Sequence, residues 1–203
     1  EIYKEFKEEI TRFKVHFVNA DEKAKLEAFM FGCTSYTDKV NEAKLNPNVV
    51  GKDATWIAEQ AGFKVPEDTQ IICAECKEVG PNEPLTREKL SPVLAVLKAT
   101  STEDGIAKSA AMVEFNGLGH SAAIHTQNHD ISVEFGLKCK AIRVIENAPS
   151  TFGGIGSVYN AFIPSLTLGC GSYGHNSVSN NVSAVNLLNI KRIGRRNNNM
   201  QWV

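Results

Sequence analysis

Long hydrophobic runs are missing from this sequence, and no apolar segment approaches the roughly 18 residues that a membrane-spanning helix needs. The first ten residues, EIYKEFKEEI, are rich in charge and do not resemble a signal peptide. An excess of one charge is also missing, because the net charge of -1 gives no general attraction to nucleic acid or anionic lipid. We therefore expect a cytoplasmic protein that binds neither a membrane nor nucleic acid.

The sequence also lacks the paired cysteines of a disulfide framework. Its cysteines are odd in number and scattered: Cys33, Cys73, Cys76, Cys139 and Cys170. Cys73 and Cys76 form a C-x-x-C, but they lie in a strand-like run without the helix start that lowers the pKa of a redox thiol. No second C-x-x-C completes a zinc site, and the histidines show no metal-ligand spacing with cysteines or acids. We expect free structural thiols and no metal site.

Acidic residues are absent after Glu146, and residues 149–181 are instead dense in glycine, serine, threonine and asparagine. Glycine lets a backbone approach a ligand closely, and hydroxyl and amide side chains offer neutral hydrogen bonds, so this composition is typical of a ligand-binding loop. Gly169, Gly171 and Gly174 spell G-x-G-x-x-G between a strand-like run at 163–168 and a possible helix at 177–188. A dinucleotide fingerprint needs an acid about 20 residues further on, and its absence weighs against a Rossmann site.

Hydrophobic spacing predicts an α/β protein. Helices are expected at residues 1–14, at 22–31 with Asp21 as N-cap, and at 50–61, 102–115 and 130–137. Short apolar runs predict strands at 70–73, 93–97, 122–125 and 142–145. The alternation favours a three-layer fold with a largely parallel sheet, and we expect one domain over residues 1–203 because no linker is evident.

Two polar side chains stand near the predicted starts of strands. Glu88 precedes the strand at 93–97, where a carboxylate can accept two hydrogen bonds from a vicinal diol such as a ribose. His120 ends the glycine-rich turn 116–120, where an imidazole can act as an acid, a base or a donor near neutral pH. The residues alone leave a solvated glutamate and a hydrogen-bonded structural histidine as alternatives.

Five short segments, taken in order, carry a resemblance to a known family. They are residues 61–66 (AGFKVP), 88–94 (EKLSPVL), 117–121 (GLGHS), 153–156 (GGIG) and 164–172 (PSLTLGCGS). Together they resemble the aldehyde dehydrogenase half of the bifunctional aldehyde-alcohol dehydrogenases, from one end of the chain to the other. The run PSLTLGCGSYGHNS is specific to this group and its CoA-acylating relatives, whereas Glu-x-x-x-Pro-Val is shared across the aldehyde dehydrogenase superfamily.

The resemblance implies an aldehyde dehydrogenase-like catalytic subdomain that acts in fermentative alcohol metabolism. In the implied reaction acetaldehyde, CoA and NAD+ give acetyl-CoA and NADH through a cysteine thioester. By position, Glu88 matches the carboxylate that binds the nicotinamide ribose, and His120 matches a catalytic histidine. The other residues that the resemblance assigns to cofactor binding are Leu90, Ser91, Pro92, Gly119, Gly169 and Gly171.

The resemblance also implies that parts of the parent enzyme lie outside this sequence. In the family the nucleophile belongs to a Cys-Ala-Ser-Glu-like motif, which none of the cysteines here matches. An N-terminal nucleotide-binding domain and a C-terminal iron-dependent alcohol dehydrogenase domain have no counterpart here either. We therefore expect a subdomain that is inactive alone, with residues 190–203 forming a strand that leads to an interdomain linker. Because parents in this family form homo-oligomers and helical filaments, an assembly role is the alternative.

Overall fold

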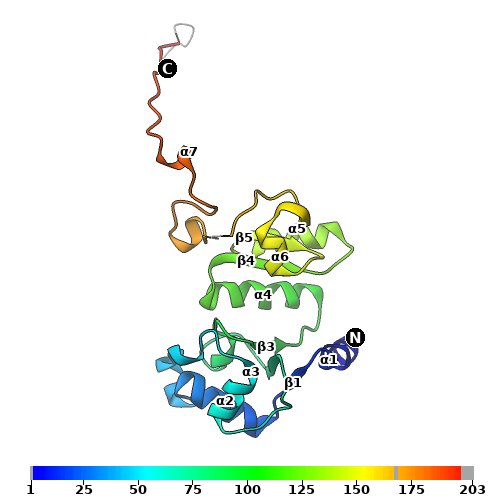
Figure 1. Cartoon of the computed structure of the whole chain (residues 1–203). Helices are drawn as coiled ribbons and strands as arrows, with labels where there is room; N and C mark the ends of the chain where they lie inside the picture. Colours follow the sequence, from blue (N-terminus) through cyan, green and yellow to red (C-terminus); the bar gives the residue numbers. More distant parts are fainter. Residues whose placement is uncertain (1, 167–168, 198–203) are drawn as a thin grey trace.

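The computed structural model describes residues 2–166 and 169–197, whose strands form two small sheets (Figure 1). The first sheet has the order β1 (Val15–Phe17), β2 (Ile71–Cys76) and β3 (Val93–Leu97). The second sheet pairs β4 (Gly119–Ile124) with β5 (Ala141–Glu146). Each strand pair in the described residues is parallel, which confirms the predicted α/β class with parallel strands.

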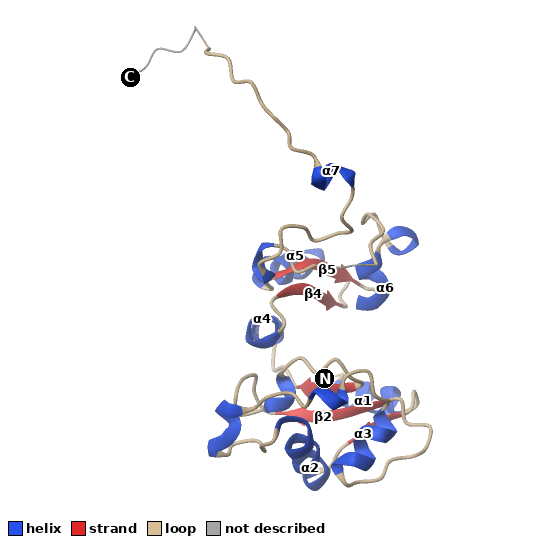
Figure 2. Ribbon diagram, turned by 60° about the vertical axis from the view of Figure 1, so that its left-hand side comes forward, coloured by secondary structure: helices blue, strands red, loops and turns tan. Residues whose placement is uncertain are grey.

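The strands do not form the one sheet that the sequence predicts. Helix α4 (Thr102–Asn116) lies between the two sheets in both views (Figures 1 and 2). Strands pair only where their backbones lie about 4.8 Å apart. In the part of the chain that the structure describes, β3 therefore pairs with neither β4 nor β5.

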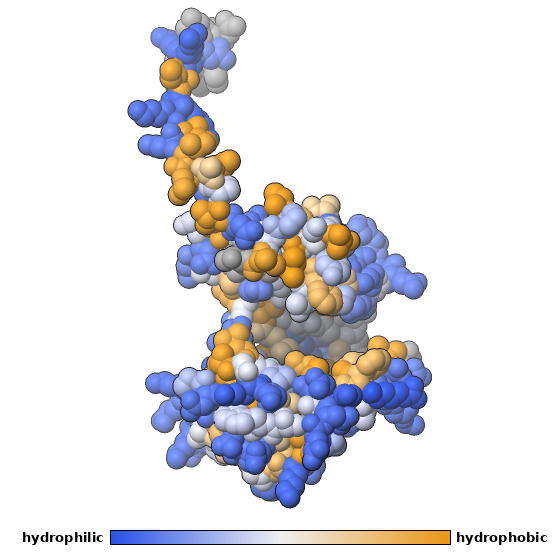
Figure 3. Space-filling model, viewed as in Figure 1, coloured by the Kyte–Doolittle hydropathy of each residue, from blue (hydrophilic) through white to orange (hydrophobic). Residues whose placement is uncertain are grey.

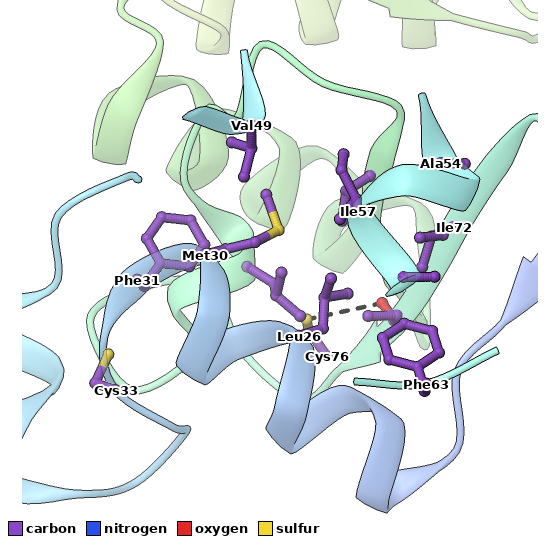
Figure 4. Close-up of a cluster of buried hydrophobic side chains, with 14 residues drawn as sticks. Leu26, Met30, Phe31, Cys33, Val49, Ala54, Ile57, Phe63, Ile72 and Cys76 are labelled. Atoms are coloured by element: carbon purple, nitrogen blue, oxygen red, sulfur yellow. Dashed lines mark hydrogen bonds between the residues drawn. The ribbon is translucent and has the colours of Figure 1, made fainter. Parts of the chain in front are cut away.

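The first sheet is the middle of three layers, as predicted. Successive side chains of a strand point to opposite faces. Ile72 of β2 packs into a core with Leu26 and Ile57, whereas Glu75 faces the other side and accepts a hydrogen bond from Lys7 at 2.8 Å (Figure 4). The core face is covered by α2 (Ala20–Phe31) and α3 (Ala54–Ala61), and the other face by α1 (Tyr3–Thr11).

The second sheet has a much smaller core. Helices α5 (His129–Lys138) and α6 (Ser150–Ile155) pack beside it. Its buried apolar cluster consists of Ile106, Phe135 and Cys139, whereas the cluster of the first sheet contains fourteen residues. Less apolar burial gives less local stability, so the second sheet is the weaker part of the described chain.

The structure corrects the predicted starts of helices α2 and α3, and α1 and α5 begin within two residues of their predicted starts. Helix α2 starts at Ala20 because Asn19, and not Asp21, is its N-cap: Asn19 Oδ1 accepts from the backbone N–H of Glu22, and Glu22 Oε2 accepts from that of Asn19, each at 3.0 Å. Helix α3 starts four residues later than predicted because Gly51, at φ +71°, interrupts the helical path. The 3-10 helices are Asp38–Glu42, Pro47–Val49, Pro84–Thr86, Ser157–Tyr159 and Ser172–Gly174.

The C-terminal segment leaves the body of the protein as an exposed tail (Figure 1). The helix predicted at 177–188 shortens to α7 (Ala184–Leu187), because serine and asparagine favour turns and caps over helix interiors. Residues 163–166 of the predicted strand 163–168 form no strand, and 167–168 lie outside the described residues. Figure 3 shows hydrophobic side chains along the tail, where Ile193 is 91% exposed.

The strand predicted at 190–203 is wrong for residues 190–197, and residues 198–203 lie outside the described part. In the described chain no strand lies beside the extended tail, so its backbone has no neighbouring strand with which to form sheet hydrogen bonds. Among the residues described, no helix combines the length and the apolar character needed to cross a bilayer.

Candidate functional site

The segments that contain the predicted site residues lie at the amino-terminal ends of strands. Residues 88–92 lead into β3, and Gly119 and His120 begin β4. Residues 169–174 pack against the first residues of β4 and β5. Helix α4 ends at Asn116, which bonds to the first segment and stands just before the second. The structure therefore brings three segments that are distant in sequence to neighbouring positions.

The loop that carries Glu88 is held by backbone contacts. Glu88 N donates to Asn116 Oδ1 at 2.9 Å, and Gly51 N donates to Leu90 O at 3.1 Å. Leu90 has a φ of +47°, which is strained for a residue with a side chain, and this side chain is exposed. Such a conformation persists where the surrounding contacts determine the backbone, as they do here.

Ser91 and Pro92 connect this loop to the first sheet. Ser91 O accepts from Val93 N at 2.8 Å, and Pro92 O accepts from Ile72 N at 2.9 Å. The Ser91 hydroxyl oxygen is buried and has no hydrogen-bond partner among the described residues. A buried polar atom of this kind is a candidate for contact with a ligand or another polypeptide.

The Glu88 carboxylate is exposed at the surface of this held loop. In residues 2–166 and 169–197 we find no hydrogen bond or ion pair to its oxygens, although its backbone N–H is engaged. The lone pairs of this carboxylate are therefore available to a ligand that donates hydrogen bonds.

Lys89 fixes the inner side of the loop. Its Nζ donates to Leu85 O at 2.5 Å and to Arg87 O at 2.8 Å, and the residue is only 8% exposed. Burial disfavours the ammonium and lowers the pKa of Lys89 to about 8, although the charge of Glu88 acts in the opposite direction. On the other side of Glu88, the Arg87 guanidinium lies 4.6 Å from the ring centre of Phe115 in α4. Both flanks of Glu88 are thus anchored.

Gly119 is in direct contact with residues 169–179, which we call the glycine-rich loop. A Cβ on Gly119 would lie 2.3 Å from Cys170 O, and the φ of Gly119 is +93°. A Cβ on Gly171 would lie 2.8 Å from Ile142 Cγ2 of β5. Both positions therefore require glycine for close approach.

His120 follows Gly119 directly and is exposed. Its Nδ1 lies 2.9 Å from Ser121 Oγ, and no partner of Nε2 is found in the described part of the chain. This arrangement leaves one ring nitrogen for a ligand or a proton transfer. His120 directly follows Gly119, the residue that contacts the glycine-rich loop.

Arg143 of β5 joins the second sheet to the base of this loop, and it was overlooked in the sequence. Only 5% of the residue is exposed. Its Nη1 donates to Gly169 O at 3.0 Å, and its Nη2 donates to Ser179 O and, at 3.3 Å, to Asn180 Oδ1. An arginine within the apolar run 141–145 is a sequence signal, because a buried charge needs partners.

The thiols are free, as predicted, and four of them are buried: Cys33, Cys73, Cys76 and Cys139. Burial raises the pKa of Cys73 to about 11 and that of Cys76 to about 12, so this C-x-x-C holds no thiolate at neutral pH. Burial of both thiols favours the structural interpretation of this C-x-x-C. Cys170 is partly exposed and lies in the loop against Gly119.

A pocket of about 500 Å³ at the carboxyl-terminal ends of β1 and β2 contains none of the predicted site residues. Its polar walls bond to one another: Lys23 Nζ donates to Glu83 Oε2 at 2.5 Å, and Ser35 Oγ donates to Glu27 Oε1 at 2.6 Å. Burial raises the pKa of Glu83, but the hydrogen bonds from Lys23 and the backbone outweigh it and lower that pKa overall. Groups that satisfy one another in this way are typical of a structural cluster.

The chain is similar over its whole length to part of the aldehyde-alcohol dehydrogenases. It is 68% identical over 203 residues to the aldehyde-alcohol dehydrogenase of Streptococcus pneumoniae and 61% identical over 202 residues to aldehyde-alcohol dehydrogenase 2 of Entamoeba histolytica. Each match covers 100% of this chain but only 23% of the relative's length. No protein-family model matches the chain.

Comparison of the fold with solved structures agrees with the comparison of sequences. An acetylating aldehyde dehydrogenase from Geobacillus thermoglucosidasius matches with a TM-score of 0.82 and 34% identity, over 98% of this chain and 42% of that one. The predicted aldehyde dehydrogenase-like fold is therefore confirmed. Sequence and fold together show that the chain is similar, over its whole length, to a segment of the aldehyde-alcohol dehydrogenases and to part of an acetylating aldehyde dehydrogenase.

Proposed function

We propose that this chain supplies one side of the active site of an acylating aldehyde dehydrogenase. The parent enzyme would interconvert acetyl-CoA and NADH with acetaldehyde, CoA and NAD+ in the cytoplasm during fermentative alcohol metabolism. The observation that carries the proposal is the convergence of residues 88–92, 119–120 and 169–171. The family resemblance assigns each of these segments to one cleft, and their contacts through Asn116 and Cys170 support that assignment.

Glu88 fits the role of a ribose ligand. Its backbone is held while its carboxylate stays exposed, so it can accept hydrogen bonds from both hydroxyls of a vicinal diol without reorganising. Ser91 Oγ offers a further polar contact, and Leu90 and Pro92 form the adjoining wall. NADH, when bound, supplies the hydride for the reaction.

His120 fits a role beside the reacting thioester. Its exposed imidazole can act as a general acid or base toward a bound substrate. Gly119, Gly169 and Gly171 carry no side chains, which lets the glycine-rich loop pack closely on itself and on β4 and β5, and we propose that their backbone lines the cleft.

The nucleophile and its oxyanion donors are proposed to come from parts of the parent outside this chain. Four of the cysteines here are buried, and Cys170 lies in a loop that does not contain the nucleophile of the family. In the complete site, a cysteine thiolate displaces the CoA thiolate from acetyl-CoA, and reduction of the enzyme thioester releases acetaldehyde and restores the thiolate. We therefore expect the chain alone to be inactive.

Acetyl-CoA-dependent oxidation of NADH tests this proposal. The assay compares this chain with a longer polypeptide that includes the cysteine motif and the nucleotide-binding domain. Activity of the longer polypeptide alone is the expected result. Turnover by the short chain would point to Cys170 as the nucleophile, and inactivity of both proteins would overturn the proposal.

Glu88→Gln in the longer polypeptide tests the ribose contact. The amide keeps the size of the side chain but removes a charged acceptor, so we expect the KM for NADH to rise roughly tenfold, as for loss of one hydrogen bond to a charged group. Glu67→Gln, at an exposed position outside the three segments, is the matched control. A KM for NADH equal to that of the wild type would contradict the role of Glu88.

A second function, assembly of the parent enzyme, is favoured by the exposed tail. Its large apolar side chains are Val182, Val185, Leu187, Leu188, Ile190 and Ile193, all more than 60% exposed. An extended segment with exposed apolar side chains is suited to pairing with a strand of another polypeptide. In this alternative the subdomain contributes chiefly to a homo-oligomer or filament.

Sedimentation of the parent enzyme without residues 190–203 tests the alternative. Smaller particles that keep their specific activity would support an assembly role. Filaments of unchanged size, with activity lost, would reject it.

A further inference from the structure

Arg143 occupies an unusual environment for a cation. It is 5% exposed, and no carboxylate forms an ion pair with it among the residues that the structure describes. Its guanidinium donates instead to neutral acceptors, namely the carbonyls of Gly169 and Ser179 and the side-chain oxygen of Asn180. A buried charge is unfavourable unless its hydrogen-bond donors are satisfied. These contacts therefore require the planar, forked set of N–H donors of an arginine guanidinium.

The acceptors of Arg143 lie at both ends of the glycine-rich loop. Gly169 begins the loop, Ser179 ends it, and Gly169 N donates to Ser179 O at 3.1 Å. Within the loop, Cys170 N donates to Asn176 Oδ1 at 2.7 Å. With its ends joined and its base attached to β5, the loop can move only as a unit.

The glycine-rich loop packs directly against the start of β4. The carbonyl of Cys170 lies 2.3 Å and Tyr173 Cβ lies 2.9 Å from the point where Gly119 would carry a Cβ. His120 is the next residue. A displacement at the base of the loop would therefore reach the backbone that holds the imidazole.

We propose that Arg143 is a positioning residue, whose fork on Gly169 and Ser179 sets the position of the glycine-rich loop against His120 and so the affinity of the site for acyl-CoA. The kinetic part of this inference rests on the proposed function. The restraint that Arg143 places on the loop does not rest on the proposed function, and it can be measured separately.

Alkylation of Cys170 in the full 203-residue chain measures the restraint, since the other cysteines are buried. Arg143→Met removes the donors but keeps a long side chain, and we expect it to raise the labelling rate of Cys170 by about tenfold because the loop opens more often. Arg192→Met, in the exposed tail, should leave the rate unchanged. An unchanged rate in Arg143→Met would overturn the proposal.

A labelled Cys33 or Cys139 would show that Arg143→Met has unfolded the chain. In that case Arg143→Lys decides, because lysine keeps the charge and one donor but cannot form the fork. Faster labelling of Cys170 with Cys33 and Cys139 protected supports the proposal, and a rate equal to that of the wild type rejects it.

The kinetic readout uses the longer, active polypeptide. For Arg143→Lys we expect the KM for acetyl-CoA to rise roughly tenfold with kcat within about threefold of the wild type. A merely structural role would lower the amount of active enzyme, and hence kcat, without raising KM. Faster labelling of Cys170 with an unchanged KM would overturn the positioning role. If the unmutated longer polypeptide is inactive, the proposed function fails, while Cys170 labelling still decides whether Arg143 holds the loop.

Discussion

Lys89 shows, at the scale of a single residue, that the site loop is held at a cost in stability. Its buried ammonium satisfies two backbone carbonyls, yet burial lowers the pKa of Lys89 to about 8 from its ordinary value of 10.5. Between these two pH values the unfolded chain binds more protons than the folded chain. The contribution of Lys89 to the free energy of unfolding therefore rises with pH across this window, whereas the raised pKa values of Cys73 and Cys76 act in the opposite direction.

Lys89→Met should remove this rise. For the wild type, the contribution of Lys89 approaches about 1.4 kcal/mol per pH unit within the window from pH 8 to 10.5. Urea unfolding at a series of pH values measures the slope, with Lys64→Met at an exposed position as control. If the free energy of unfolding depends on pH equally in the wild type and in Lys89→Met, burial does not lower the pKa of Lys89.

Gly119→Ala tests the contact between β4 and the glycine-rich loop. The added methyl group would overlap Cys170 O at 2.3 Å, and a φ of +93° strains any residue with a Cβ. We expect a loss of about 2 kcal/mol or more in the free energy of unfolding. Gly194→Ala, where no atom lies within 4 Å and φ is not in the left-handed region, should change stability by less than about 0.5 kcal/mol.

At this scale the sequence pointed to the exposed candidate site residues, but not to the residues that hold them in place. Glu88 and His120 stood out because a family motif contains them, and their chemistry can be read from residue type. Asn116 and Arg143 were missed because their partners, Glu88 and the loop at 169–180, are brought to them only by the tertiary fold.

Helix α2 gives a prediction at the scale of an element. Asn19→Ala removes the side-chain cap and should cost about 1 kcal/mol in the free energy of unfolding. Asp21→Ala, at the cap expected from the sequence, removes only an exposed ion pair with Lys25 and should cost less than half as much. Thermal or urea unfolding of both variants distinguishes the two positions. A greater loss in Asp21→Ala would reverse the assignment of the N-cap.

Elements with a long, regular apolar pattern were predicted most closely. The strand expected at 93–97 is β3, and the helix expected at 102–115 is α4 with one more residue. β1 was missed because its three residues give no periodic pattern. β4 begins earlier than expected because Gly119, although typical of a turn, pairs in register with Ala141 of β5. Pairing between distant strands extends elements beyond the reach of local propensity.

At the scale of the whole molecule, the two sheets should differ in stability. The buried cluster of the first sheet contains fourteen residues, whereas that of the second, against which α4 and α5 pack, contains three. We expect hydrogen exchange of the backbone amides in β4 and β5 to be at least about tenfold faster than in β2 and β3. Mass spectrometry of proteolytic fragments after exchange measures this difference.

The same measurement in the longer polypeptide provides the comparison. If the rest of the parent covers the smaller core, as the proposed function implies, protection of β4 and β5 should increase there more than that of β2 and β3. Equal protection of the two sheets in the short chain would contradict the inference from apolar burial.

The predicted site residues lie at the amino-terminal ends of the strands, and this separation has a consequence for protein engineering and evolution. The turns that follow β2 and β4, at the carboxyl-terminal ends, contain none of those residues. A reporter peptide or an inherited insertion in the exposed turn at residues 127–128 would be carried on the side of the sheet away from the proposed site residues. Sequence can therefore be added and selected at one edge of this scaffold while the edge that carries the proposed site stays unchanged.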